Sequence, residues 1–465
     1  METMTSTTAS PPRQLPGWLK NTVFAAGILA LCWGGAIVYW RTSANTPATT
    51  DLLLVLLAAP LCLLGAVWLG KKVVVARSKA APATAPTPAA QTAPATPPSA
   101  PALALLASAL RAPHGASAEE LAAAIAANQA RSDLDPELVD DDGFPVTSAR
   151  SDAALDEALQ EEITEWLMLA GMADLQLGET HWRALTLGTA VVRDMADEAL
   201  MQLLPESGTP PPLRLLPLLP ASWTVEQRHA AGLWFKHTVA QFGWPLEHLG
   251  RAEVARDATL ASVLGQCVAD SQAVTMLVAC DSHIAQETVD EWAANETLFK
   301  SERLQGGVPG EGAAGLLITS SKHAQSLQRR SFALLDPMRE VGMASVNDNK
   351  PLAAAPLSNL ARQACSEANV ELGNVGMIVA DTGSRINRVG ELMEMASSAF
   401  PHLDTTADVA CVGISSGNCG VVSCVTTLAL AQYQAASRTT PVLYASNEEA
   451  YVRYVALVHP MSLHT

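Results

Sequence analysis

Five residues in the last part of the chain have the spacing of a serine hydrolase nucleophile. Gly413-Ile414-Ser415-Ser416-Gly417 fits G-x-S-x-G and stands between an apolar run and a helical stretch, as the motif requires. A hydrolase also needs an acid and then a histidine, and only Glu448 or Glu449 with His459 remain downstream. That segment is too short for the usual intervening strands and helices. A structural glycine turn is favoured, and a serine hydrolase using Ser415 and His459 is the alternative.

Other polar groups follow apolar runs. Asp281 and His283 come after a predicted strand, where catalytic groups often lie in α/β sheets, although a plain loop is favoured. The loop from Asp381 to Arg385 could bind an anion through its amides and its guanidinium group, with a plain turn again favoured. The VDDDG stretch at 139–143 lacks the spaced oxygens of a calcium loop. The ten histidines are not paired, so neither a metal site nor a cofactor is predicted.

Short apolar runs and helical stretches alternate along the chain after residue 104. Runs bounded by turn residues predict buried strands at 213–219, 274–279, 314–319, 375–379, 409–412, 441–444 and 454–458. Helical spacing covers 118–129 and 152–169. Strands of this kind, interleaved with helices, indicate an α/β domain whose sheet is covered on both faces. The densest blocks, around 255–320 and 360–460, suggest a duplicated α/β unit.

Two charge-free apolar runs near the N-terminus predict transmembrane helices at 22–40 and 52–70. Positive charges flank the pair: Arg13 and Lys20 before it, and Lys71, Lys72, Arg77 and Lys79 after it. The loop between the spans has only Arg41. By the positive-inside rule both ends face the cytoplasm, with residues 1–21 as a cytoplasmic tail. The predicted location is a bacterial inner membrane, with the lipid bilayer as a partner through residues 22–70.

A linker separates the membrane anchor from the rest. Residues 71–103 are basic at first and then rich in Pro, Ala and Thr, a composition typical of an extended spacer. Residues 104–465 form the predicted cytoplasmic domain, whose cysteines should be reduced thiols. The chain has 29 basic and 46 acidic residues and a net charge of -17. This composition argues against nucleic-acid binding, which needs a basic face.

Three motifs carry a resemblance to a known family. Residues 309–314 read PGEGAA, and Thr382-Gly383-Ser384 is followed by Glu391. Gly413, Gly417 and Gly420 have the spacing of a third glycine turn. Together they resemble the β-ketoacyl synthases of the thiolase-like superfamily. The resemblance implies a duplicated layered α/β domain with halves at roughly 104–325 and 326–465, and a homodimer formed through edge strands.

The catalytic residues of that family are replaced at every matching position. The positions that correspond to its cysteine, first histidine, second histidine and lysine are Val254, Ala380, Ile414 and Val409. A one-residue gap would place the first histidine on Asp381 instead, and 251–257 contains no cysteine. Condensation needs a thiolate to hold the acyl group and imidazoles to stabilise developing charge. The resemblance therefore implies a domain that does not condense acyl groups.

The function predicted from the sequence is that of a catalytically inactive, membrane-anchored adaptor or scaffold. Bacterial chains with two spans and a degenerate synthase-like domain suggest an accessory role in protein export, such as type VI secretion. The alternatives are a protein that binds acyl-CoA, acyl-carrier protein or lipid, and the hydrolase that uses Ser415.

Overall fold

The computed structural model describes residues 102–203, 210–251, 259–269, 273–327, 331–343 and 352–462. The two predicted spans, nearly all of the predicted linker and Val254 lie outside these residues. Among the residues that are described, no helix is long and apolar enough to cross a membrane.

The described chain contains two sets of five strands. Those of the first half are β1 (Leu103–Arg111), β4 (Leu213–Leu218), β5 (Leu249–Arg251), β6 (Val274–Ser282) and β7 (Glu311–Ser320). Those of the second half are β8 (Ser331–Leu335), β10 (Met377–Ala380), β11 (Val409–Cys411), β12 (Val442–Ser446) and β13 (Val452–Ser462). Each strand predicted from an apolar run is present, with small shifts at its ends.

The two halves repeat one topology. In each half, the third strand lies at the edge, followed by the second, fourth, fifth and first, in the order β5-β4-β6-β7-β1 and β11-β10-β12-β13-β8. The second strand is parallel to the third and fourth, and the fifth is antiparallel to its neighbours in both halves. The halves join where β1 pairs with β8, with Leu103 opposite Leu335. This is the duplicated unit that the apolar runs suggest.

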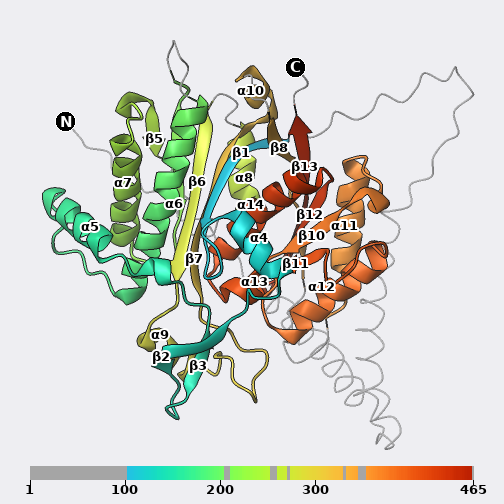
Figure 1. Ribbon diagram of the computed structural model, residues 1–465, viewed down its shortest axis with the longest axis horizontal. Helices are drawn as coiled ribbons and strands as arrows, with labels where there is room; N and C mark the ends of the chain where they lie inside the picture. Colours follow the sequence, from blue (N-terminus) through green and yellow to red (C-terminus); the bar gives the residue numbers. More distant parts are fainter. Residues whose placement is uncertain are drawn as a thin grey trace, which may run out of the picture. The chain divides into compact units, whose positions relative to one another are not determined.

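Helices cover the sheet in layers (Figure 1). The middle layer contains α4 (Ala118–Ala126), α8 (Leu260–Ala269) and α14 (Val421–Arg438). The outer layer of the first half contains α5 (Glu157–Leu169), α6 (Glu179–Leu203) and α7 (Val225–Gln241). The outer layer of the second half contains α11 (Ala355–Glu367) and α12 (Ile386–Ala399).

Burial on both faces explains why the strands read as continuous apolar runs. Along β6, Met276 and Val278 pack against the outer helices, whereas Leu277 and Ala279 pack in the middle layer. A strand with helices on both faces has no side that favours polar residues. The alternation that marks a half-exposed strand is therefore missing from the sequence.

Smaller elements complete the fold. They are the hairpin of β2 (Asp133–Val139) and β3 (Pro145–Ser148), the strand β9 (Arg339–Gly342) on β13, and the helices α9 (Gln286–Ala294), α10 (Ser321–Ser326) and α13 (Val412–Ser416). Short 3-10 turns lie at Asp152–Ala154, Leu246–His248 and Leu372–Asn374.

Both predicted helices are shorter than expected. The helix predicted at 152–169 begins at Glu157, because the Asp156 side chain accepts a hydrogen bond from the Leu159 N–H and caps the first turn. The helix predicted at 118–129 ends at Ala126, and Asn128 follows with a positive φ of 59°. A left-handed residue of this kind ends a helix.

Candidate functional site

The carboxyl ends of three parallel strands converge in the second half. Ala380 at the end of β10 pairs with Cys411 at the end of β11 and with Ala445 in β12. The chain then enters the loop from Asp381 to Arg385, the turn at 412–420 and the turn at 447–451. Residues that follow such strand ends can therefore meet at one edge of the sheet.

The turn at 412–420 packs against both halves of the domain through three glycines. A Cβ atom on Gly413 would lie 2.4 Å from the Asp381 carbonyl oxygen, and one on Gly417 would lie 2.9 Å from the Gly310 Cα. A Cβ atom on Gly420, whose φ is +57°, would lie 2.9 Å from Asp281 Oδ2. Real Cβ contacts at these distances do not occur without movement. Only glycine fits at each point, which explains the spacing read in the sequence.

Ala380, Val409 and Ile414, three of the positions that the motif match assigns to catalytic residues of the family, carry aliphatic side chains. Ala380 is fully buried at the end of β10, and Val409 begins β11. Ile414 lies in α13 and is partly buried, and its carbonyl oxygen accepts a hydrogen bond from Ser132 Oγ at 3.1 Å. A methyl group and a butyl group offer neither a proton nor a positive charge to a developing enolate.

Asp381 is the buried acid of this edge. Its Oδ2 accepts hydrogen bonds from Ser446 Oγ at 2.6 Å and from Cys424 Sγ at 3.3 Å. Its Oδ1 accepts from the Asn447 N–H at 3.0 Å and from the Glu448 N–H at 3.4 Å. Burial raises the pKa of Asp381 to about 6, with the Glu448 carboxylate adding to the rise and the donors opposing it.

The carboxylate of Glu448 binds the loop that follows Asp381. Glu448 accepts a hydrogen bond from the Gly383 N–H at 3.0 Å and from Arg385 Nε at 2.7 Å. Thr382 Oγ1 donates to Asn447 Oδ1 at 2.6 Å, which ties the same two loops together. The Gly383 amide and the Arg385 guanidinium group, which could bind an anion in the alternative to a plain turn, are thus occupied by a carboxylate from the chain itself.

Two buried ion pairs support these strand ends. In the second half, Arg453 Nε lies 2.9 Å from Glu391 Oε1, and both side chains are fully buried. In the first half, Arg183 Nη2 lies 2.6 Å from Glu311 Oε1 with almost no exposure. Glu311 also accepts from Ser282 Oγ at 2.9 Å. Each pair links an outer helix to the fifth strand of its half, and so fixes the loop next to it.

The structure does not bring Ser415 and His459 together. Ser415 lies within α13 and its Oγ donates to the Val412 carbonyl oxygen at 2.7 Å, so it has no strained turn of the kind that exposes a hydrolase nucleophile. His459 Nε2 lies 2.7 Å from Asp336 Oδ2. His459 is adjacent to Val458, which pairs with Val442 at the start of β12, whereas α13 follows the opposite end of the sheet.

The Asp281 and His283 pair is likewise part of the packing. Asp281 is 8% exposed, and burial raises its pKa, with His283 and His181 opposing the rise. His283 Nδ1 lies 2.7 Å from the Asn418 carbonyl oxygen, and its ring lies 5.1 Å from that of Trp292. The imidazole therefore holds the glycine turn in place.

The buried thiols do not resemble catalytic nucleophiles. Burial raises the pKa of Cys365 to about 11 and those of Cys411 and Cys419 to about 12. It also raises the pKa values of Cys280 and Cys424 far above the usual range. A thiol is nucleophilic as its thiolate, which these surroundings disfavour.

The acidic stretch at 140–142 forms the tip of the β2–β3 hairpin. Lys300 Nζ contacts all three carboxylates, at 3.2 Å from Asp140 Oδ2, at 3.9 Å from Asp142 Oδ2 and also at Asp141. Asp140 Oδ1 accepts from the Asp142 and Phe144 N–H groups. The ammonium group thus neutralises part of the negative charge at this turn.

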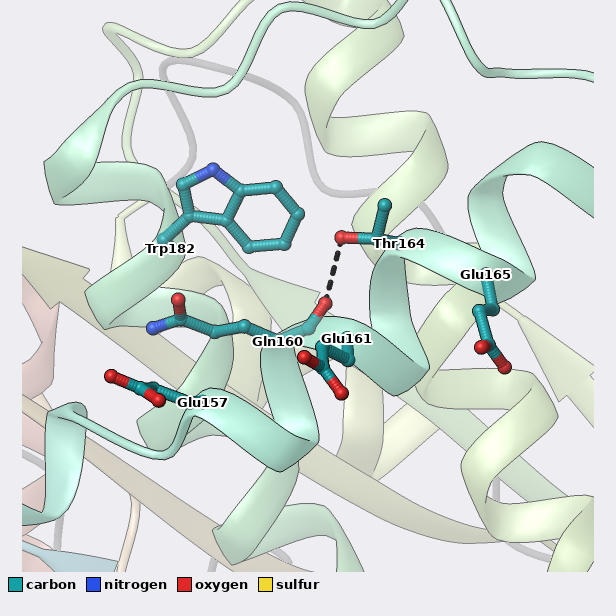
Figure 2. Close-up of a pocket in the computed structure, with 6 residues that line it drawn as sticks. All are labelled: Glu157, Gln160, Glu161, Thr164, Glu165 and Trp182. Atoms are coloured by element: carbon teal, nitrogen blue, oxygen red, sulfur yellow. Dashed lines mark hydrogen bonds between the residues drawn. The ribbon is translucent and has the colours of Figure 1, made fainter.

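An open surface depression of about 400 Å³ lies elsewhere, on the outer layer of the first half. Figure 2 shows its lining: the Trp182 ring of α6 faces side chains of α5, which are Glu157, Gln160, Glu161, Thr164 and Glu165. None of these residues belongs to the strand ends described above. The depression is therefore separate from the site that the sequence motifs mark.

Sequence reasoning missed four members of the site, which are Ser446, Asn447, Cys424 and Arg453. A signal for two of them was present, because the polar stretch from Ser446 to Glu449 directly follows a predicted buried strand. Cys424 and Arg453 lie inside a helix and a strand, and only the three-dimensional packing reveals their contacts.

Known structures with this layered arrangement identify the fold. The ketosynthase from module 6 of the bacillaene synthase from Bacillus subtilis 168 matches with a TM-score of 0.55 and 10% identity, over 78% of this chain and 72% of that chain. The oxazolomycin ketosynthase domain from Streptomyces albus JA3453 matches with a TM-score of 0.53 and 12% identity, over 79% and 75%. The chain has a thiolase-like ketosynthase fold.

A third structure of this fold, the ishigamide ketosynthase/chain length factor, matches with a TM-score of 0.52 and 13% identity over 77% of this chain and 99% of that chain. No protein-family model matches the chain, and no curated protein matches it. At these identities the ketosynthase likeness establishes the fold and leaves the activity to be argued from the site.

Proposed function

We propose that this chain is a membrane-anchored protein of ketosynthase fold that does not condense acyl groups and acts by binding a partner. The observation that carries the proposal is the chemistry at the strand ends. The motif match assigns Ala380 and Ile414 to the positions of the family's two histidines, and neither side chain holds a proton or a charge. With a one-residue gap the first position falls on Asp381, whose carboxyl group is held by four internal donors. The buried thiols add support, since their raised pKa values disfavour a thiolate.

The proposed site of action is the inner face of a bacterial inner membrane, through the predicted spans at 22–40 and 52–70 and the linker at 71–103. The homodimer and the role in protein export, such as type VI secretion, stay predictions that rest on the resemblance and on the build of the chain.

The test is capture of the full-length tagged protein from its own cells, followed by mass spectrometry of bound proteins and of extracted small molecules. A specific protein partner without acyl ligands supports the binding role. Co-purified acyl-CoA, acyl-carrier protein or lipid would favour the alternative, a ketosynthase fold that still binds acyl ligands.

A separate variant tests the alternative that the chain is a serine hydrolase. Ser415→Ala should leave partner capture and any cellular phenotype unchanged, because the Ser415 hydroxyl contacts a backbone carbonyl and no histidine. Loss of the phenotype in a folded, normally abundant Ser415→Ala protein would count strongly against the binding role.

A further inference from the structure

The loop after β10 binds the carboxylate of Glu448 through an amide and a guanidinium group. Glu448 comes from the turn between β12 and β13, and its two oxygens are bound separately. Arg385 Nε donates to Oε1 at 2.7 Å, and the Gly383 N–H donates to Oε2 at 3.0 Å. Arg385 Nη2 also donates to the Glu448 carbonyl oxygen at 3.0 Å. Hydrogen bonds to ionised groups are the strong ones, so this geometry recognises an anion.

Solvent reaches this ion pair. The side chains of Arg385 and Glu448 are 23% and 28% exposed, whereas the nearby pair of Glu391 and Arg453 is fully buried. Gly383 makes the contact possible, because a Cβ atom there would lie only 3.2 Å from Glu448 Oε1. An anion from outside can therefore meet the same donors once Glu448 moves away.

Both guanidinium groups and carboxylates surround the loop. Burial lowers the pKa of Arg388, and the like charges of Arg453 and Arg385 lower it further. Arg453 uses Nη1 to bind the carbonyl oxygens of Glu449 and Val452, and its buried Nη2 has no hydrogen-bond partner among the described residues. Three guanidinium groups thus lie at this edge of the sheet, with the carboxylates of Glu391, Glu448 and Asp381 among them.

We propose that the loop from Gly383 to Arg385 is an anion-binding site in which Glu448 is an internal ligand, displaced by a phosphate or carboxylate group of a small molecule or partner. Ile386 and Tyr451 are 56% and 63% exposed and lie next to Arg385 and in the Glu448 turn, so they offer apolar surface to the rest of that ligand. The inference goes beyond the binding role proposed above and does not depend on it, since the donors are present whether or not acyl groups are condensed.

Isothermal titration of the full-length protein in detergent, at low ionic strength, tests the site with inorganic phosphate and with acetate. Glu448→Ala removes the internal ligand and should bind one of these anions about ten-fold more tightly than the unaltered chain, a difference of about 1.4 kcal/mol. Arg385→Ala in the Glu448→Ala background should abolish the gain. Glu449→Ala is the matched control, because its exposed carboxylate lies next in the chain and should leave anion affinity unchanged.

The probes separate the ligand classes. A gain with phosphate alone supports a phosphate-bearing ligand, and a gain with acetate supports a carboxylate. Glu448→Ala protein that binds neither anion more tightly than the unaltered chain overturns the inference, as does a gain that survives the loss of Arg385. If Glu448→Ala does not fold, Glu448→Gln keeps the side-chain size, and the same comparisons with Arg385→Ala decide.

Discussion

At the residue scale, Asp381 shows how burial and hydrogen bonding compete. Burial raises its pKa to about 6 from 3.8, although two side chains and two backbone amides donate to it. Desolvation of the charge thus outweighs the donors. Because the folded-state pKa is the higher one, this group stabilises the fold fully below about pH 3.8, and the contribution is lost as pH rises through about 6.

Asp381→Asn should therefore flatten the pH dependence of stability. A shift of about 2 units corresponds to about 3 kcal/mol, so the stability of the variant relative to the unaltered chain should rise by up to that amount between pH 4 and pH 7.5. Thermal unfolding at the two pH values measures this difference, with the exposed residue Asp152 changed to Asn as a control. An identical pH dependence in Asp381→Asn and the unaltered chain would contradict the assignment.

Some residues of the site at the strand ends can be predicted from the sequence, and others cannot. Ala380 lies at the end of β10 and Ile414 lies in α13, directly after β11, because short motifs fix the place of both residues relative to the strands. The partners of Asp381 are Ser446 and Cys424, which come from distant elements, and no local pattern predicts such a contact.

At the element scale, the turn at 412–420 holds the halves together at the site. Gly310 of the PGEGAA segment faces it so closely that an added Cβ atom would lie 2.0 Å from the Ser416 carbonyl oxygen. Gly310→Ala should destabilise the domain by about 3 kcal/mol, because the backbone must move apart. Gly373→Ala, where a Cβ atom meets open space, should change stability by less than about 0.5 kcal/mol. Equal unfolding midpoints for the two variants would show that the turn does not pack as described.

The buried ion pair of Glu391 in α12 and Arg453 in β13 should contribute far more to the stability of the fold than an exposed ion pair. Removing one partner with Glu391→Ala leaves the Arg453 charge buried, at a cost of about 3–5 kcal/mol. Glu162→Ala breaks the more exposed pair with Arg193 and should cost at most about 1 kcal/mol. Chemical denaturation of both variants compares the two costs. A loss below 1 kcal/mol for Glu391→Ala would mean that Arg453 finds water or another partner.

Element boundaries were less predictable than element types. Apolar runs located the strands because burial on both faces leaves nothing but apolar side chains. The start of α5 depends on Asp156 as a cap, and the end of α4 depends on the left-handed Asn128. Periodic spacing of apolar residues predicts neither feature. Between 104 and 250 the sequence does not predict β1, whose partners β7 and β8 lie some two hundred residues later in the chain, or the β2–β3 hairpin, which forms a separate two-stranded sheet.

At the scale of the whole molecule, the repeat of strand order in both halves explains why two short motif blocks were enough to suggest the fold. The block around 255–320 covers β6 and β7, the fourth and fifth strands of the first half, and the block around 360–460 covers β10 to β13, the second to fifth strands of the second half. The predicted membrane anchor belongs to the same scale, and that prediction rests on the composition of residues 22–70 alone.

Deleting residues 22–70 should convert a membrane-bound protein into a soluble one, since both charge-free runs are removed while the domain from residue 104 is intact. Fractionation of cells that express each form, with a high-salt wash, measures the change. A truncated chain that still pellets with membranes in high salt would show that the two spans are not what holds it there.

A protein of ketosynthase fold without condensing chemistry should not accept an acyl group, and this can be measured as acyl transfer to the protein. The full-length chain is incubated with an acyl-CoA and its intact mass is measured, beside an active ketosynthase as a positive control. The account predicts an unchanged mass, because no thiolate is available at the strand ends and the described thiols with raised pKa values stay protonated. A stoichiometric acyl adduct on any residue of the domain would contradict it.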